Sequence, residues 1–221
     1  MSPRSRRGEE APEQWVREAW QAASLLLGYP DAEQRARLPL LRAVTTRLPE
    51  PAAGPLERLI SHLEATPTGE AAAASVDTFD HQRRCCPYLT YFSCGDTRKR
   101  GMALLRFKQA YRSAGLILAD DELPDHLAVV LEFAATGDAG AGRRLLLEHR
   151  AGVELLRLAL EERSSPYADA LRAVCATLPP LAADDRDSML RLAAEGPPTE
   201  EVGLQPFAPP EYMPETTGAR R

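Results

Sequence analysis

The chain has 221 residues, of which 44% are hydrophobic and 27% charged, and its formal net charge is −5. This length is sufficient for one domain with a sizeable core. Aromatic residues are scarce, at 6%, whereas Ala, Leu and Arg dominate, which favours helices over strands. The acidic balance argues against a dedicated nucleic-acid or membrane-surface protein. No apolar run approaches the roughly 18 residues that a membrane-spanning helix needs.

The four cysteines show neither a disulfide-scaffold spacing nor paired CxxC motifs. They are Cys85, Cys86, Cys94 and Cys175. An Arg6–Arg7 pair lies near the start, but no hydrophobic stretch follows it, so it does not match an export signal. We therefore expect a cytoplasmic protein with reduced thiols.

Apolar residues at helical spacing predict one all-α domain over residues 12–195. We expect an antiparallel bundle of about nine to ten helices, because most of the predicted connections are short. Residues 1–11 are polar and predict a disordered arm. The Pro- and Glu-rich stretch 196–221 lacks an apolar face and predicts a flexible tail.

Local signals set the expected helix ends. The first helix opens at Pro12 and ends at Gly28, and Asp31 starts the second with a capping-box-like spacing to Gln34. Pro49 is expected to end the second helix. The remaining stretches with helical signals are 55–65, 69–79, 124–137, 143–150, 153–163, 166–178 and the segment capped by Asp184. The pair 143–150 and 153–163 also fits one helix bent near Gly152.

A long helix is expected between two turn signals in the middle of the chain. Asp96, after Gly95, suits its N-cap, and Gly115 suits the left-handed residue just past its end. Apolar residues occur on more than one side of this helix, which is typical of a central element. Residues 98–100 are all cationic, although the helix dipole disfavours cations in a first turn by about 0.3–1 kcal/mol each.

Positive charge is concentrated around this helix. Residues 81–115 carry eight Arg or Lys and one acid, so their net charge is +7, which leaves −12 for the rest of the chain. Both lysines of the chain, Lys99 and Lys108, lie here. The stripe suggests a surface for an anionic or carbonyl-rich partner. The alternatives are a solvated face neutralised by neighbouring acids and a DNA-binding helix, although no short helix precedes it at helix-turn-helix spacing.

Glu122, Asp125 and His126 form the group most typical of an enzyme. A carboxylate beside an imidazole can tune its pKa for acid–base chemistry. The same residues also fit a structural role, because Asp125 would lie in the first turn after Pro124 and Glu122 would help to cap that turn. Catalysis, partner binding and structure all remain open for this group.

The other chemical motifs are weak. His81 and Cys85 are four residues apart and, with Cys86 and Cys94, are candidates for a metal cluster, but they lack the paired spacing of structural zinc sites. The sequence contains no Walker loop, GxGxxG, GxSxG or HExxH motif. No class of enzyme is therefore indicated.

Three stretches resemble the NarJ family of nitrate reductase assembly chaperones, within the wider TorD-like group. They are YLTYFSCGDTRKRGMALLRFKQAYRSAG at 88–115, ELPDHLAVVLEFAA at 122–135 and SPYADALRAVCATLP at 165–179. With weaker similarity from Trp15 onward, the resemblance covers roughly residues 12–195.

The resemblance implies an all-helical, TorD-like fold without catalysis and without a stably bound cofactor. Such chaperones bind the N-terminal segment of the nitrate reductase catalytic (alpha) subunit in the cytoplasm. They hold it until bis-molybdopterin guanine dinucleotide is inserted and then release it for membrane assembly. Molybdenum cofactor biosynthesis proteins are further implied partners, whereas nucleic acid and stable membrane insertion are not implied. The alternatives are a chaperone for a different molybdoenzyme and a small hydrolase that uses Glu122, Asp125 and His126.

Seven positions in the matching motifs are expected to bind the partner peptide. They are Tyr88, Tyr91, Arg98, Arg100, Glu122, Asp125 and His126. We expect the aromatic side chains to line the floor of an apolar groove, as in helix-in-groove recognition. The basic stripe and the acidic loop 120–125 would then contact opposite ends of the peptide, matching its dipole and charges.

Overall fold

The computed structural model describes residues 12–119, 122–196 and 198, which form eleven α-helices and one short 3₁₀ helix. The all-α prediction is confirmed, with slightly more helices than expected. Within the described part no β-strand forms, although Tyr88 and His126 make an isolated antiparallel bridge. The predicted arm at 1–11, and the predicted tail apart from residues 196 and 198, lie outside the described residues.

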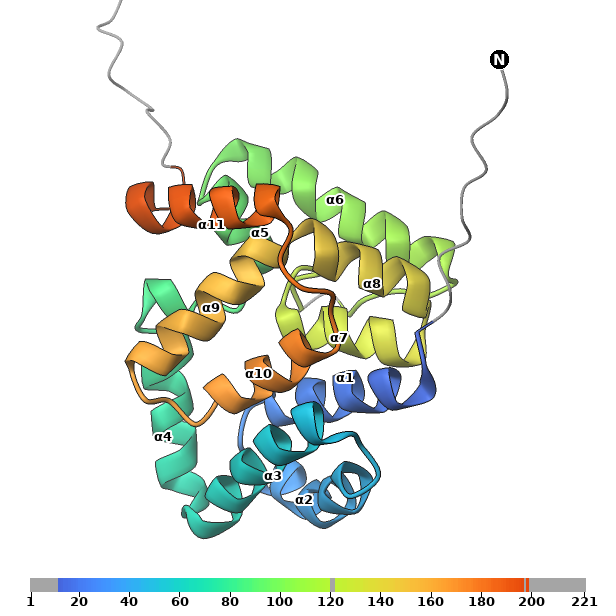
Figure 1. Ribbon diagram of the computed structural model, residues 1–221, viewed down its shortest axis with the longest axis vertical. Helices are drawn as coiled ribbons and strands as arrows, with labels where there is room; N and C mark the ends of the chain where they lie inside the picture. Colours follow the sequence, from blue (N-terminus) through green and yellow to red (C-terminus); the bar gives the residue numbers. More distant parts are fainter. Residues whose placement is uncertain (1–11, 120–121, 197, 199–221) are drawn as a thin grey trace, which may run out of the picture.

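The helices follow one another with short connections (Figure 1). In chain order they are α1 (Gln14–Leu26), α2 (Ala32–Thr45), α3 (Glu50–Ala65), α4 (Thr68–Phe79), η1 (Arg83–Cys85), α5 (Leu89–Cys94), α6 (Arg98–Ser113), α7 (Leu127–Thr136), α8 (Ala139–Glu148), α9 (Arg150–Glu162), α10 (Ala168–Ala176) and α11 (Ala183–Glu195). None of the described helices has both the length and the apolar character needed to cross a membrane.

Helix α1 is the centre of the core, and it packs against α2, α3, α7 and α10. In Figure 1 it runs between α7 and the pair α2 and α3. Its Trp20 is fully buried, and the indole Nε1 donates a hydrogen bond of 2.8 Å to Oγ1 of Thr177, just after α10. Ala19 and Ala23 are also buried on α1, where their small side chains allow neighbouring helices to approach closely.

The turn from α1 to α2 is held by side chains that the sequence partly predicts. The Asp31 side chain accepts a hydrogen bond of 2.8 Å from the Gln34 N–H, as the predicted cap requires. The buried Gln34 amide in turn donates to the carbonyls of Leu25 (3.1 Å), Leu26 (3.3 Å) and Gly28 (2.9 Å). Those carbonyls end α1 and would otherwise lack intrahelical partners, so this one side chain fixes the corner.

Two other predicted caps are wrong. The N-cap of α6 is Thr97, and Asp96 instead forms an ion pair of 3.2 Å with Arg100 one turn later. Helix α11 begins at Ala183, before Asp184, and its N-cap Ala182 makes no side-chain cap. The cap of α6 is one residue later than expected and that of α11 is two residues earlier, so the acidic side chain is not at the cap in either helix. Gly115 does adopt the expected left-handed conformation, with φ of 77°.

Prolines also act differently from the prediction at the start of α3. This helix begins at Glu50, so Pro51 lies in its first turn, where a missing N–H costs nothing. Pro55 lies inside the same helix rather than at its start.

Farther along, the two stretches around Gly152 form separate helices, α8 and α9, which meet at His149.

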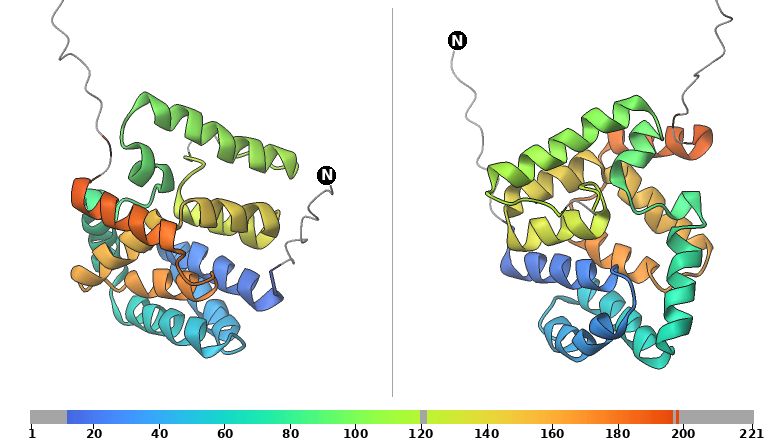
Figure 2. Two further views of the ribbon diagram at one scale, coloured as in Figure 1. Left: turned by 45° about the horizontal axis from the view of Figure 1, so that its top comes forward. Right: turned by 180° about the vertical axis from the view of Figure 1, so that it is seen from behind.

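Helix α6 lies at the edge of the molecule, so the expectation of a central helix is wrong. In the left view of Figure 2 it runs along the outer side of the fold. Only Phe107 and Tyr111 are buried on it, and Tyr111 donates its hydroxyl hydrogen to the Pro124 carbonyl. Met102 is 69% exposed and Leu105 is 54% exposed, so these two large apolar side chains lie in solvent, whereas Leu104 is half-buried.

We expect opposite effects from adding one methyl group at two helical glycines. At Gly142 on α8 the methyl would collide with Ala134 on α7, and overpacking should lower the free energy of unfolding by about 1–3 kcal/mol. At Gly101 on α6 nothing lies within 4 Å, so Gly101→Ala should raise it by roughly 0.5–1 kcal/mol. Urea denaturation of both variants measures these changes. Equal effects of the two substitutions would contradict the close packing of α7 and α8.

Candidate functional site

A short backbone pairing joins two segments that are far apart in the sequence. The N–H of Leu89 donates to the Asp125 carbonyl at 3.0 Å, and the N–H of Leu127 donates to the Pro87 carbonyl at 2.9 Å. These bonds form the antiparallel bridge between Tyr88 and His126. The start of α5 and the start of α7 are thereby fixed next to each other.

Asp125 is the polar centre of this junction, and its side chain is fully buried. Its Oδ2 accepts hydrogen bonds from the N–H (3.1 Å) and the hydroxyl (2.5 Å) of Thr90, at the first turn of α5. The guanidinium of Arg100 lies 3.7 Å from the same oxygen and donates to the Thr90 hydroxyl at 3.2 Å. One carboxylate therefore ties together α5, α6 and the segment before α7.

Arg100, Tyr88 and His126 are in contact above this carboxylate. The guanidinium carbon of Arg100 lies 5.4 Å from the centre of the Tyr88 ring, a cation–π distance. The rings of Tyr88 and His126 meet edge to face at 5.3 Å. Asp125 lies in a turn that is closed by a hydrogen bond of 3.1 Å from the His126 N–H to the Leu123 carbonyl, and its side chain is directed to Thr90 by the hydrogen bonds described above. The carboxylate thus turns inward to Thr90, whereas the imidazole turns toward Tyr88.

His126 has a structural role that the sequence did not predict. Helix α7 starts at Leu127 instead of Pro124, and His126 is its N-cap. Its Nδ1 accepts a hydrogen bond of 3.2 Å from the Ala128 N–H, which requires that nitrogen to be unprotonated. Burial lowers the pKa of His126, and the nearby Asp125 carboxylate opposes that shift. The helix start therefore holds a neutral imidazole.

A cleft of about 710 Å³ opens beside the junction. It lies between the end of α1, the start of α2, the end of α4 and the segment around the start of α7, elements that Figure 2 shows from behind in its right view. Tyr88 and His126 form part of its wall. Its apolar lining consists of Leu25, Leu27, Val76, Phe79, Pro87, Leu123, Leu127, Ala128, Val129 and Leu156.

Acidic side chains surround this apolar lining. They are Asp31, Glu33, Asp80, Glu122 and Glu132. Arg37 is the cation among the lining residues, and it forms an ion pair with Glu33. The excess of carboxylates gives the cleft a negative potential, which attracts a cationic ligand. An apolar floor with charged edges suits an amphipathic peptide.

The structure separates the seven predicted peptide-binding residues into groups. Tyr88, Glu122 and His126 line the cleft. Arg100 and Asp125 lie behind it, in the network described above. Tyr91, which packs edge to face on Phe92 at 6.0 Å, and Arg98, at the start of α6, are not among the residues that line the cleft.

Several residues of the site were not identified from the sequence. Thr90 has no sequence feature that marks it as the partner of Asp125, since the two are 35 positions apart. The acids of α2, α4 and α7 belong to separate helices whose faces converge only in the folded chain. Asp31 was recognised as a helix cap, but nothing in the sequence placed it at a cleft.

The predicted metal candidates do not gather into a metal site. His81 is on the surface, 3.9 Å from Asp77, while Cys85 is buried in the core. In residues 12–119 and 122–196, no group of three His, Cys, Asp or Glu side chains has an arrangement that would hold a metal ion.

The fold is similar to that of a redox enzyme maturation protein. The crystal structure of an Archaeoglobus fulgidus protein so described matches with a TM-score of 0.54 and 27% sequence identity. The match covers 72% of this chain and 90% of that protein. The nitrate reductase delta subunit family model matches residues 45–173. The chain belongs to this family, in agreement with the predicted NarJ resemblance.

Two NarJ proteins are similar in sequence to this chain. A NarJ protein of Bacillus subtilis, described as a nitrate reductase molybdenum cofactor assembly chaperone, is 34% identical over 71% of this chain and 86% of its own length. NarJ of Escherichia coli, with the same description, is 30% identical over 66% of this chain and 63% of its own length. These relatives are described as chaperones rather than catalysts, as the resemblance implied.

A third relative is much longer than this chain. The nitrate reductase-like protein NarX of Mycobacterium tuberculosis is 45% identical over 74% of this chain. The matched region is 24% of NarX, so the chain spans about a quarter of that protein.

Removal of the Asp125 carboxylate should destabilise the protein rather than only weaken binding. In Asp125→Ala, the two Thr90 donors lose their acceptor and the partly buried Arg100 loses its ion-pair partner, at a cost of about 2–4 kcal/mol. Urea denaturation measures the loss. The matched control is Glu122→Ala, an exposed carboxylate three residues away, which should change stability by less than about 0.5 kcal/mol. Equal stability of the two variants would refute the structural role of Asp125.

The stability of the protein should fall as the pH is lowered below about 6.5. His149 packs on the Phe107 ring at 5.2 Å, and burial lowers its pKa from 6.5 to about 4. The unfolded chain therefore takes up a proton at His149 in this pH range before the folded chain does. Compared with wild type, His149→Gln should lose on the order of 2 kcal/mol less stability between about pH 6.5 and 4.5. Denaturation at a series of pH values tests this, and identical slopes for the two proteins would contradict it.

Proposed function

We propose that this protein is a nitrate reductase assembly chaperone that binds the N-terminal segment of the catalytic subunit in the acidic cleft. The observation that carries this proposal is the combination of an apolar floor with five surrounding carboxylates, in a member of the nitrate reductase delta subunit family. The NarJ relatives, which are described as assembly chaperones, support the class of function.

The cleft suits a short segment of polypeptide. Its volume of about 710 Å³ lies in the range of small-ligand sites, so it accommodates a few side chains of a partner. We infer that an amphipathic helix places its apolar face on Leu25 and Val129 and its basic residues near Glu122 and Glu132. Of the seven positions that the sequence motifs predict to bind the peptide, Tyr88 and His126 would contact the bound segment directly. Arg100 and Asp125 would act through them, by fixing their orientation.

Moderate affinity is required, because the partner has to leave once it is assembled. A micromolar dissociation constant corresponds to about −8 kcal/mol, which a few buried side chains can provide. In this proposal the chaperone acts in the cytoplasm and keeps the catalytic subunit competent for insertion of bis-molybdopterin guanine dinucleotide. The cofactor is the cargo of the partner, and proteins of molybdenum cofactor biosynthesis are the expected donors.

Titration calorimetry with a synthetic peptide of the catalytic subunit's N-terminal segment tests the cleft. The double variant Glu122→Lys and Glu132→Lys reverses charge at the cleft, and it should weaken binding by at least about tenfold because a basic peptide loses its counter-charges. The control is Glu148→Lys with Glu195→Lys, two exposed acids outside the cleft that give the same change in net charge. Unchanged affinity in the cleft variant, with circular dichroism as in wild type, would reject this site.

Affinity capture from the host under nitrate respiration tests the identity of the partner. The tagged chain should retain the nitrate reductase catalytic subunit, and the captured subunit should contain less molybdenum than the mature enzyme. Capture of a different molybdoenzyme instead would favour the alternative chaperone. Turnover by the purified chain alone that is lost in Glu122→Ala would support the hydrolase and contradict the proposal.

A further inference from the structure

The outward face of α6 is not used by the cleft or by the proposed chaperone function. No acidic residue occurs between Thr97 and Ala119, a stretch that contains six cations. The large cleft and the two smaller hollows of the described part are lined by residues of other elements. The outward face of α6 is thus a strongly positive surface separate from these three hollows.

Helical geometry separates the two sides of α6. Each residue advances by about 100° around the axis, so the row that contains Met102 and Leu105 lies opposite Phe107 and Tyr111. The latter two are buried, whereas the former are 69% and 54% exposed. Two large apolar side chains thus point directly away from the body of the protein.

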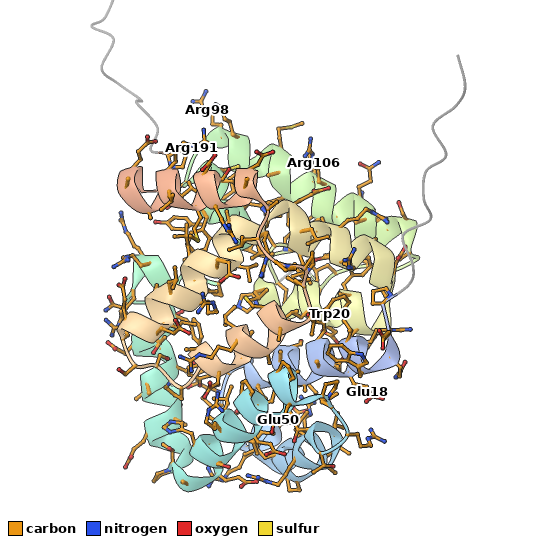
Figure 3. The ribbon with its side chains drawn as sticks, viewed as in Figure 1. Glu18, Trp20, Glu50, Arg98, Arg106 and Arg191 are labelled. Atoms are coloured by element: carbon orange, nitrogen blue, oxygen red, sulfur yellow. The ribbon has the colours of Figure 1, made fainter. Side chains whose placement is uncertain are left out.

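Cations flank this apolar row on both sides. By the same geometry, Lys99 and Arg106 lie on one side of it and Lys108 and Arg112 on the other. All four are exposed, and none of them forms an ion pair with another described residue. Figure 3 shows the side chain of Arg106 extending outward from α6. The charges remain available to an external partner.

The apolar character continues past the end of the helix. Gly115 turns the chain, and the next residues, Leu116 and Ile117, are 43% and 92% exposed. Solvent-exposed Ile and Leu at the end of a basic helix add apolar surface that is available for burial against a partner.

We propose that the outward face of α6, together with Ile117, docks on an anionic lipid bilayer. A helix with a central apolar row and lateral Lys and Arg lies in the plane of a membrane interface, with its apolar tips below the headgroups. The long stems of the cations extend along the surface and direct their charges to lipid phosphates. A straight helix face with cations on both sides of an apolar row fits a flat, laterally uniform partner. The contact is peripheral, and it uses residues separate from the cleft.

Vesicle flotation with the full chain tests this proposal. The protein should float with vesicles of phosphatidylglycerol and phosphatidylcholine but not with phosphatidylcholine alone, and added salt should weaken the binding. Because Lys99 and Lys108 are the two lysines of the chain, amine acetylation followed by mass spectrometry reports on α6 directly. Anionic vesicles should protect both lysines.

Two variants separate the charged and apolar contributions. Replacing Lys99, Arg106, Lys108 and Arg112 with Gln should reduce the partition onto anionic vesicles by at least about tenfold. Met102→Ser with Leu105→Ser should also reduce it, since these exposed residues contribute apolar contact without supporting the fold. The charge control replaces four arginines of surface ion pairs on other elements, and it should bind vesicles as wild type does. Those arginines are Arg42, Arg47, Arg84 and Arg163.

Three outcomes would overturn the proposal. The first is equal flotation with anionic and neutral vesicles, and the second is wild-type binding by the α6 variants. The third is that the wild-type protein does not bind vesicles but captures a protein or is retained on DNA, and that the charge variant loses this interaction. That result would assign the face to a macromolecular partner instead. The calorimetric test of peptide binding in the cleft is carried out without lipid. A negative result in that test therefore leaves the vesicle experiment unaffected.

Discussion

The buried carboxylate of Asp125 is the interaction on which the arrangement of the site depends. It holds Thr90 of α5 and lies against Arg100 of α6, while the backbone on either side pairs with residues 87–89. The junction matters most for α6, because that helix buries only Phe107 and Tyr111. The same junction orients the Tyr88 and His126 rings at the wall of the cleft. A side chain that resembled a catalytic acid therefore acts by positioning others.

The division of charge between two surfaces explains how an acidic protein carries a strongly basic helix. The cleft gathers carboxylates from α2, α4, α7 and the segment before α7, whereas four of the α6 cations are exposed, namely Lys99, Arg106, Lys108 and Arg112. At physiological ionic strength charges are screened beyond about 8 Å, so each surface acts on its own surroundings. The net charge of −5 consequently says little about either surface. One molecule can then present a cationic face and an anionic cleft to different partners.

The geometry around His126 bears on the choice between chaperone and hydrolase. An acid–base pair needs a carboxylate that is hydrogen-bonded to the imidazole, and here the Asp125 carboxylate accepts its hydrogen bonds from Thr90 instead. His126 uses Nδ1 to cap α7, and Asp125 uses Oδ2 for Thr90. Both groups thus serve to hold the cleft wall, which agrees with the description of the NarJ relatives as assembly chaperones.

The sequence by itself determined the helices and some of their ends. Apolar periodicity is a local property, and the caps at Asp31 and the left-handed turn at Gly115 depend on neighbouring residues alone. Only the tertiary structure decided that α6 lies at the edge with Met102 exposed, and that Asp125 is buried. It alone brought the five acids together at one cleft, because their proximity depends on contacts between helices distant in the chain, which no local pattern encodes.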